Sequence, residues 1–195
     1  MPAAAFPAPV LASQAVFRAL MDAFARPGVV RPLAPAAGPP PPLSATAAAV
    51  VLSLVDYESP VWLDAALSRS ERVPDWIRLQ TGARITGDPR RAAFAFVTEP
   101  ACLPAFDAFA LGTPEYPDRS TTLVLQVEEF GSGERLLLSG PGIANSCSFS
   151  ARPLPPDFAA RLAANRALFP CGIDLILVSA DAVAALPRSV ILQPE

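Results

Sequence analysis

The sequence of 195 residues contains no histidine and no lysine, and its 15 basic residues are all arginine. Histidine is the side chain whose unperturbed pKa lies closest to neutral pH, so the most common general base and metal ligand is missing. Without lysine there is no Schiff base to anchor pyridoxal phosphate and no ammonium group to hold a nucleotide phosphate. Arginine stays protonated near neutral pH, so it can hold an anion but cannot transfer a proton. These absences favour a binding or assembly role over catalysis by this chain alone.

Charged residues are few, at 17% of the chain against 52% hydrophobic residues. That composition predicts one globular domain over residues 1–195, with a well-formed core rather than disorder. The formal net charge of −3 gives no basis for nucleic-acid binding, which generally needs a basic face. Because the chain is so apolar, part of its surface is expected to be covered by a partner, or by a second copy in a homodimer when the chain is isolated.

Long apolar runs and paired cysteines are also missing. Thr46 and Ser53 interrupt the longest apolar run well short of the roughly 18 residues that a membrane-spanning helix needs, so no membrane association is expected. The opening stretch, MPAAAFPAPVL, has no basic residue and is broken by prolines, so it is not expected to act as a signal peptide. Cys102, Cys147 and Cys171 are odd in number and widely spaced, which predicts free thiols and a cytoplasmic location.

The spacing of apolar and turn-forming residues predicts an alternation of helices and strands. Helices are expected at 13–25 (capped by Ser13), 44–55, 74–81, 100–109, 155–168 and 181–186. Strands are expected at 29–30, 61–63, 92–97, 121–127, 135–139, 173–178 (the central strand) and 189–193. The strands at 121–127 and 135–139 flank Gly131-Ser132-Gly133 and are expected to pair as a hairpin. With a proline-rich surface connection at 32–42, the pattern indicates a layered α/β domain around a mixed sheet.

The sharpest local motif is Ser139-Gly140-Pro141-Gly142-Ile143, directly after a predicted strand. Glycines let the backbone approach an anion closely, although the motif lacks the GxGxxG spacing and the lysine of the two common nucleotide loops. The alternative is a tight turn between strands, which we favour.

A second polar cluster is the connection 114–122, PEYPDRSTT. Glu115 and Asp118 would suit a cation, and Arg119 with Ser120 would suit a phosphate, but an ordered polar loop without a ligand has the same composition. Further on, Asp174 lies among aliphatic residues and needs a partner, for which Arg188 or backbone N–H groups would serve. Cys147 has no histidine to activate it and is not expected to be a nucleophile.

Three functions are compatible with these residues. The first is an assembly subunit with no catalytic residues of its own. The second is a phosphate- or nucleotide-binding role, with an anion pocket made by Ser120, Thr121, Thr122, Gly140, Gly142 and Arg188. The third is a carboxylate-based hydrolase that uses Glu115 or Asp118 with a metal. The first is favoured, and no cofactor or metal is expected.

Seven short groups of residues carry a resemblance that spans nearly the whole chain. They are Phe17-Arg18-x-Leu20-Met21 with Arg26-Pro27-Gly28, Leu52-x-Leu54-x-Asp56 with Pro60-Val61-Trp62-Leu63, Arg78-Leu79-x-Thr81-Gly82-Ala83, Ser120-Thr121-Thr122-Leu123, Gly140-Pro141-Gly142-Ile143, Phe169-Pro170-x-Gly172-Ile173-Asp174-Leu175 and Leu186-Pro187-Arg188. In this order they resemble the PhnH family, the H subunits of carbon–phosphorus lyase in bacterial phosphonate degradation. Gln80 stands where some members carry histidine, so a mechanism through that side chain does not carry over.

The resemblance implies a cytoplasmic three-layer α/β/α sandwich, similar to the fold of pyridoxal-phosphate-dependent transferases but without the cofactor site. It also implies a complex with the G, I and J subunits. Together with G and I, the H subunit helps to form α-D-ribose 1-phosphonate 5-triphosphate from ATP and a phosphonate. The J subunit, an iron–sulfur radical enzyme, then breaks the C–P bond. No catalytic residue of the family falls on this chain.

Overall fold

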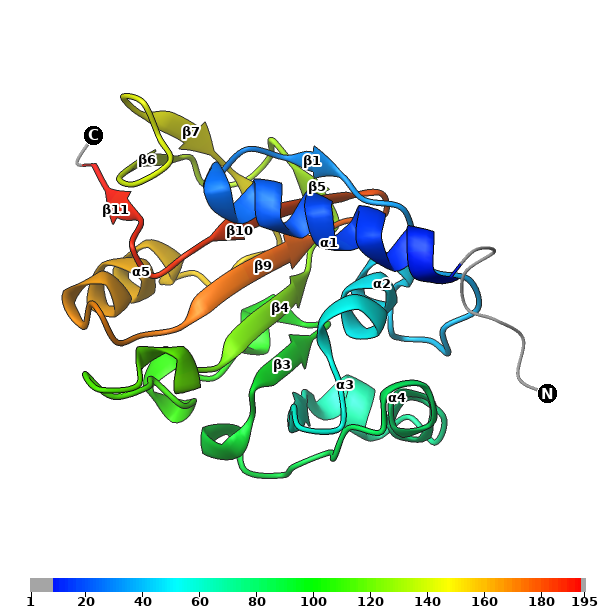
Figure 1. Ribbon diagram of the computed structural model, residues 1–195. Coiled ribbons are helices and arrows are strands. Elements are labelled where there is room, and N and C mark those ends of the chain that lie inside the picture. Colours follow the sequence, from blue (N-terminus) through cyan, green and yellow to red (C-terminus); the bar gives the residue numbers. More distant parts are fainter. Residues whose placement is uncertain (1–8, 194–195) are drawn as a thin grey trace.

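A six-stranded mixed sheet forms the centre of the computed structural model, which describes residues 9–193 (Figure 1). Its strands, in spatial order, are β1 (Arg31–Pro32), β10 (Ala182–Leu186), β9 (Asp174–Val178), β4 (Thr122–Gln126), β3 (Phe94–Val97) and β2 (Val61–Leu63). Strands β2, β3, β4 and β9 run parallel, whereas β10 and β1 are antiparallel to their neighbours. The predicted mixed sheet is therefore confirmed. The expectation about the opening stretch concerns residues that lie mostly outside the described ones.

Side chains alternate between the two faces of this sheet and build one apolar core on each. Along β4, Val124 belongs to one core, while Leu123 and Leu125 belong to the other. The first core is covered by α1 (Pro9–Ala25), α2 (Ala45–Leu54), α3 (Ala65–Ser68) and α4 (Val73–Thr81). The second is covered by α5 (Phe158–Ala167), by short 3₁₀ helices and by two small sheets. Helices α1 and α2 lie in front of the sheet in Figure 1.

Several predicted helices are present, with ends that local sequence explains. Ser44 caps α2, because its hydroxyl accepts a hydrogen bond from the Ala47 amide (3.1 Å). Gly82 ends α4 in the left-handed conformation, at φ 74°. Helix α1, however, already includes Pro9, the first residue that the structure describes, so Ser13 lies within the helix and the prediction that Ser13 caps it is wrong.

The small sheets correct one predicted pairing. Strand β5 (Glu129–Phe130) pairs with β8 (Ala151–Arg152), and β6 (Leu136–Ser139) pairs with β7 (Cys147–Phe149) and β11 (Ile191–Leu192). The predicted hairpin between 121–127 and 135–139 is therefore wrong, since β4 pairs with β3 and β9 instead. A run as apolar as β4 is buried on both faces and suits the middle of a parallel sheet.

Three other element predictions also differ from the structure. The helix expected at 181–186 is strand β10, which pairs with β9 after a tight turn at Ser179. The helix expected at 100–109 is two 3₁₀ helices, η2 (Pro100–Cys102) and η3 (Phe106–Ala108), because Pro104 between them cannot continue a helix. The first strand, predicted at 29–30, is β1 at 31–32, a shift of two residues.

The remaining elements match their predictions to within a few residues, including the central strand β9. The connection 33–43 between β1 and α2 has no regular secondary structure. None of the described helices is long and apolar enough to cross a membrane.

Candidate functional site

Asp174 and Arg188 form an ion pair, and Arg188 is one of the two kinds of partner that the sequence suggests for this carboxylate. Arg188 Nε donates to Asp174 Oδ1 (3.1 Å) and Arg188 Nη2 donates to Asp174 Oδ2 (2.5 Å). The same guanidinium also donates to the carbonyls of Pro117 (2.6 Å) and Pro170 (3.4 Å) and to Ser120 Oγ (2.5 Å). A guanidinium has five N–H donors, and these contacts use all of them. Arg188 therefore holds protein atoms and has no donor left for an external anion.

The three hydroxyl residues of the predicted anion pocket have different surroundings. Thr121 is fully buried; its hydroxyl donates to the Ala92 carbonyl (2.7 Å) and accepts from the Ala110 amide (3.2 Å), which ties three segments together. Thr122 is the first residue of β4. Ser120 accepts from Arg188, so its own O–H proton is available for a further acceptor.

Gly140 and Gly142 lie in the connection from β6 to β7, with φ angles of 122° and 83°. A Cβ added at Gly142 would collide with the carbonyl of Ala25 at the end of α1, and one at Gly140 would lie 3.0 Å from the carbonyl of Ser189. The close backbone approach that these glycines permit is an approach to other parts of the chain. This geometry supports the tight-turn interpretation.

A hollow at the amino ends of two neighbouring strands is lined by three arginines that take part in no ion pair among the described residues. It measures about 240 Å³ and is here called the arginine hollow; it is lined by Pro60, Arg90, Arg91, Ala92, Ala93, Ala110, Asp118, Arg119 and Ser120. Arg90 and Arg91 end the 3₁₀ helix η1 (Pro89–Arg91), just before β3, and Arg119 ends η4 (Pro117–Arg119), just before β4. Because β3 and β4 are parallel neighbours, their amino ends meet and bring the three guanidinium groups together.

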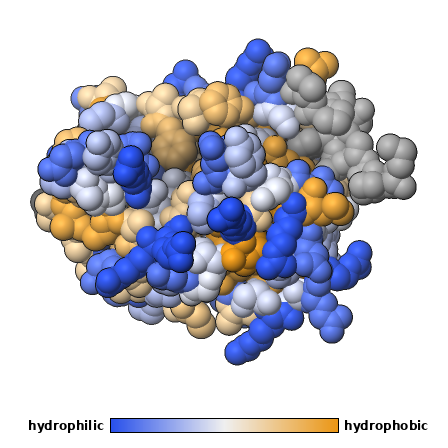
Figure 2. All heavy atoms as spheres, turned by 60° about the horizontal axis from the view of Figure 1, so that its bottom comes forward, coloured by the Kyte–Doolittle hydropathy of each residue, from blue (hydrophilic) through white to orange (hydrophobic). Residues whose placement is uncertain are grey.

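The charge of the arginine hollow is strongly positive for a chain of net charge −3. Within residues 9–193, the side chains of Arg90, Arg91 and Arg119 form no ion pair or hydrogen bond, and Asp118 is the one acidic residue in the lining. Arg119 lies over the ring of Tyr116, with its Cζ 4.1 Å from the ring centroid. Figure 2 brings this end of the molecule forward and shows strongly hydrophilic side chains gathered across it, with a few apolar ones between them.

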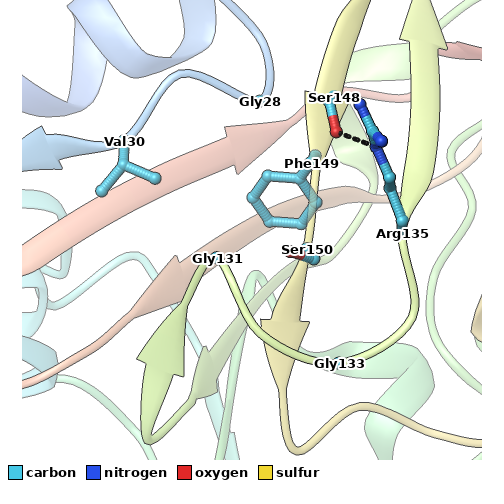
Figure 3. Close-up of a pocket in the computed structure, with 8 residues that line it drawn as sticks. All are labelled: Gly28, Val30, Gly131, Gly133, Arg135, Ser148, Phe149 and Ser150. Carbon is cyan, nitrogen blue, oxygen red and sulfur yellow. Dashed lines mark hydrogen bonds between the residues drawn. The ribbon is translucent and has the colours of Figure 1, made fainter.

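A second, larger hollow of about 420 Å³ lies between the β1 region and the small sheets (Figure 3). It is lined by Gly28, Val30, Gly131, Gly133, Arg135, Ser148, Phe149 and Ser150. Its one cationic side chain is Arg135, whose Nε donates to Ser148 Oγ (2.7 Å). Both polar and apolar groups line it, without a cluster of like charges that would select a ligand.

In the part of the chain that the structure describes, the carboxylates and thiols form no further candidate site. No three His, Cys, Asp or Glu side chains there lie close enough together to hold a metal ion, Glu115 and Asp118 included. Cys102, Cys147 and Cys171 are free thiols. The buried Asp64 caps α3 through the Leu67 amide (2.9 Å) and accepts three further hydrogen bonds from Thr98 and Glu99. Asp64 is thus a structural acceptor that joins β2 to β3.

The sequence indicates Arg119 and Ser120 as a possible phosphate site, but nothing local connects them with Arg90 and Arg91. In the sequence, 27 residues lie between Arg91 and Arg119. Only the parallel pairing of β3 with β4 brings these residues close together in space. The available signal was the position of both basic groups immediately before apolar strands, since the starts of adjacent parallel strands share one edge of a sheet.

The fold and its polar groups define an α/β protein with a basic hollow at the amino edge of its sheet. The chain belongs to the PhnH family, the bacterial phosphonate metabolism proteins, which it matches over residues 4–193. It is 50% identical over 191 residues to the "Alpha-D-ribose 1-methylphosphonate 5-triphosphate synthase subunit PhnH" of Rhizobium meliloti (strain 1021), covering 98% of this chain and 95% of that protein. It is 34% identical over 176 residues to the "Putative C-P lyase subunit protein HtxG" of Stutzerimonas stutzeri, covering 90% and 83%.

Proposed function

We propose that the protein is a subunit of α-D-ribose 1-methylphosphonate 5-triphosphate synthase, within the C–P lyase complex of phosphonate metabolism. The observation that carries this proposal is the identity of 50% across almost the full length of both chains to a subunit of that name. The protein acts with the G and I subunits to form the ribose phosphonate triphosphate from ATP and a phosphonate, and the J subunit is a further partner.

The role of this chain in the complex is assembly rather than catalysis. With no histidine or lysine, proton transfer near neutral pH would fall to carboxylates or thiols. Its most buried carboxylates, Asp64 and Asp174, are held by four hydrogen bonds and by Arg188 respectively. Groups fixed in this way support the fold and are poorly placed to exchange protons with a substrate.

Two further properties are proposed for this subunit: its fold type and its location in the cell. Apolar cores on both faces of the sheet support a three-layer α/β/α sandwich, and the family resemblance is the basis for proposing a topology similar to that of pyridoxal-phosphate-dependent transferases. The chain has no lysine to anchor that cofactor, so the cofactor site is not retained. The protein works in the cytoplasm, in keeping with its three free thiols.

An apolar surface on α1 supports the association with other chains. Leu11, Phe17 and Met21 are exposed by 69%, 47% and 41% on this helix. Apolar side chains gathered on one helix are typical of a face that another subunit covers. In the absence of its partners, the chain is expected to cover this face with a second copy as a homodimer.

The proposal is tested by co-expressing the chain with tagged G, I and J subunits and by omitting it in a matched culture. We expect the chain to co-purify in a fixed ratio and the ribose phosphonate triphosphate to form only when it is present. Formation of the product at an undiminished rate by the G and I subunits without this chain would contradict the proposal.

A further inference from the structure

We propose that the arginine hollow binds a phosphate- or phosphonate-bearing anion through Arg90, Arg91 and Arg119, with the Ser120 hydroxyl as a neutral donor. This site lies apart from the Gly140–Gly142 turn and does not use Arg188 as a ligand. The inference goes beyond the assembly role, because it concerns binding by the isolated chain.

The arginine hollow has hydrogen-bond donors that no group in the described part of the protein uses. Three guanidinium groups with no acceptor among the described residues line one hollow, opposed by Asp118 alone. A guanidinium presents a planar pair of N–H groups that matches two oxygens of a tetrahedral oxyanion. A single exposed guanidinium on a surface needs no ligand, but three positive charges around one hollow favour an anion between them.

Neighbouring side chains restrain two of these donors. Arg119 lies over the Tyr116 ring, with its Cζ 4.1 Å from the ring centroid, and this contact restrains its guanidinium. Ser120 is largely buried and receives a hydrogen bond from Arg188 Nη2, so its proton is directed to another acceptor. Arg188, saturated by Asp174 and two carbonyls, thereby positions Ser120 without touching the ligand.

The size of the hollow defines the ligand class. Its volume of about 240 Å³ is below the roughly 300–1,000 Å³ of pockets that enclose drug-sized ligands. Its lining includes the small side chains Ala92, Ala93 and Ala110, which offer neither a stacking surface nor base-reading groups. The hollow therefore suits one or two phosphoryl groups or a phosphonyl group, while the remainder of a larger ligand would lie outside.

The test is calorimetric titration of the full chain at low ionic strength with inorganic pyrophosphate, methylphosphonate, ATP and, as a planar control, acetate. We expect binding of at least one phosphorus oxyanion and none of acetate. The double variant Arg90→Gln/Arg91→Gln and the single variant Arg119→Gln should each weaken binding by about tenfold or more, since each removes charge-assisted hydrogen bonds. Asp118→Asn should tighten binding, because it removes the opposing carboxylate.

Arg69→Gln is the matched control, since it removes the same charge from an exposed arginine directly after α3, which follows the carboxyl end of β2. Its affinity should equal that of the wild type. A readout without variants is protection from phenylglyoxal: pyrophosphate should shield Arg90, Arg91 and Arg119, but not Arg69, from modification as mapped by mass spectrometry.

The outcomes separate this inference from the assembly role. Binding of pyrophosphate and ATP would assign a polyphosphate, binding of methylphosphonate alone a phosphonate, and both support the site. If no phosphorus oxyanion binds, or if Arg69→Gln weakens binding as much as the other variants, the inference is overturned whatever the complex does. If the anions fail to bind while Arg90→Gln/Arg91→Gln abolishes co-purification, the surface docks an acidic protein face and the inference is again overturned.

Discussion

Arg188 contacts Asp174 through two roughly parallel N–H···O bonds at the amino end of the central strand β9. The side chains of the pair are only 13% and 21% exposed, and the Arg188 amide also donates to Asp174 Oδ1 (2.8 Å). Because the same guanidinium reaches Ser120 and the Pro117 carbonyl, it joins the ends of β4 and β9 to the segment after β10. This one side chain thus holds the edge of the sheet at which the arginine hollow lies.

Arg188→Gln is therefore expected to destabilise the fold. It leaves the Asp174 carboxylate without its counter-charge and frees two carbonyls and a hydroxyl, a loss of about 3 kcal/mol for a largely buried pair. Arg78→Gln is the control: it breaks the Asp75–Arg78 pair, whose side chains are 78% and 53% exposed, and should cost less than about 1 kcal/mol. Urea unfolding of both variants measures the difference. Equal losses in the free energy of unfolding would show that the buried Arg188 pair stabilises the fold no more than the exposed pair does.

Much of the sheet could be predicted from the sequence because its central strands are continuous apolar runs. The run 173–178 is bounded by Gly172 and Ser179 and has a length that suits a strand, so β9 was identified with its central position. The buried carboxylate at its start also indicated a partner, and Arg188 was one of two candidates named. Both inferences depend on local composition and on the cost of burying a charge.

The pairing of strands could not be predicted from local composition. The segment 135–139 follows 121–127 closely, which is typical of a hairpin, but sequence proximity does not reveal that β4 is needed between β3 and β9. The segment of β10 favours a helix by composition, because three of its five residues are alanine. Its pairing with β9 overrides this helical preference. The arginine hollow depends on the same kind of long-range pairing, because only the contact between β3 and β4 brings Arg90 and Arg91 to Arg119.

Asn165→Ala is expected to destabilise the fold through unpaired backbone groups. Asn165 is 4% exposed, donates from Nδ2 to the Ile173 carbonyl (2.9 Å) and accepts from the Ile173 amide at Oδ1 (2.9 Å). Alanine would leave both buried backbone groups without partners, at a cost of roughly 2 kcal/mol. The exposed Asn145→Ala serves as the control and should be neutral. The inference fails if thermal unfolding gives the same Tm for both variants.

The isolated chain is expected to form a homodimer through the apolar face of α1. Light scattering at micromolar concentration should give twice the monomer mass, and Phe17→Glu/Met21→Glu should give the monomer, because burying two carboxylates in that interface is unfavourable. Leu79→Glu, at a side chain 69% exposed on α4, is the matched control and should remain dimeric. A wild-type chain that is monomeric throughout, or a double variant that stays dimeric, would exclude this interface.

Gly142→Ala is expected to lower stability while leaving the function of the folded protein intact. The residue has a φ of 83°, and its added Cβ would collide with the Ala25 carbonyl, so the substitution carries both backbone strain and a steric clash. Gly38→Ala separates these effects, because Gly38 has a φ of 66° but open space around its Cβ. Gly38→Ala should cost about 1 kcal/mol through strain alone, and Gly142→Ala distinctly more. Formation of the ribose phosphonate triphosphate by the assembled complex should fall only in proportion to the fraction folded. If Gly142→Ala folds and assembles like the wild type yet loses most of that flux, the turn approaches a ligand and not only α1.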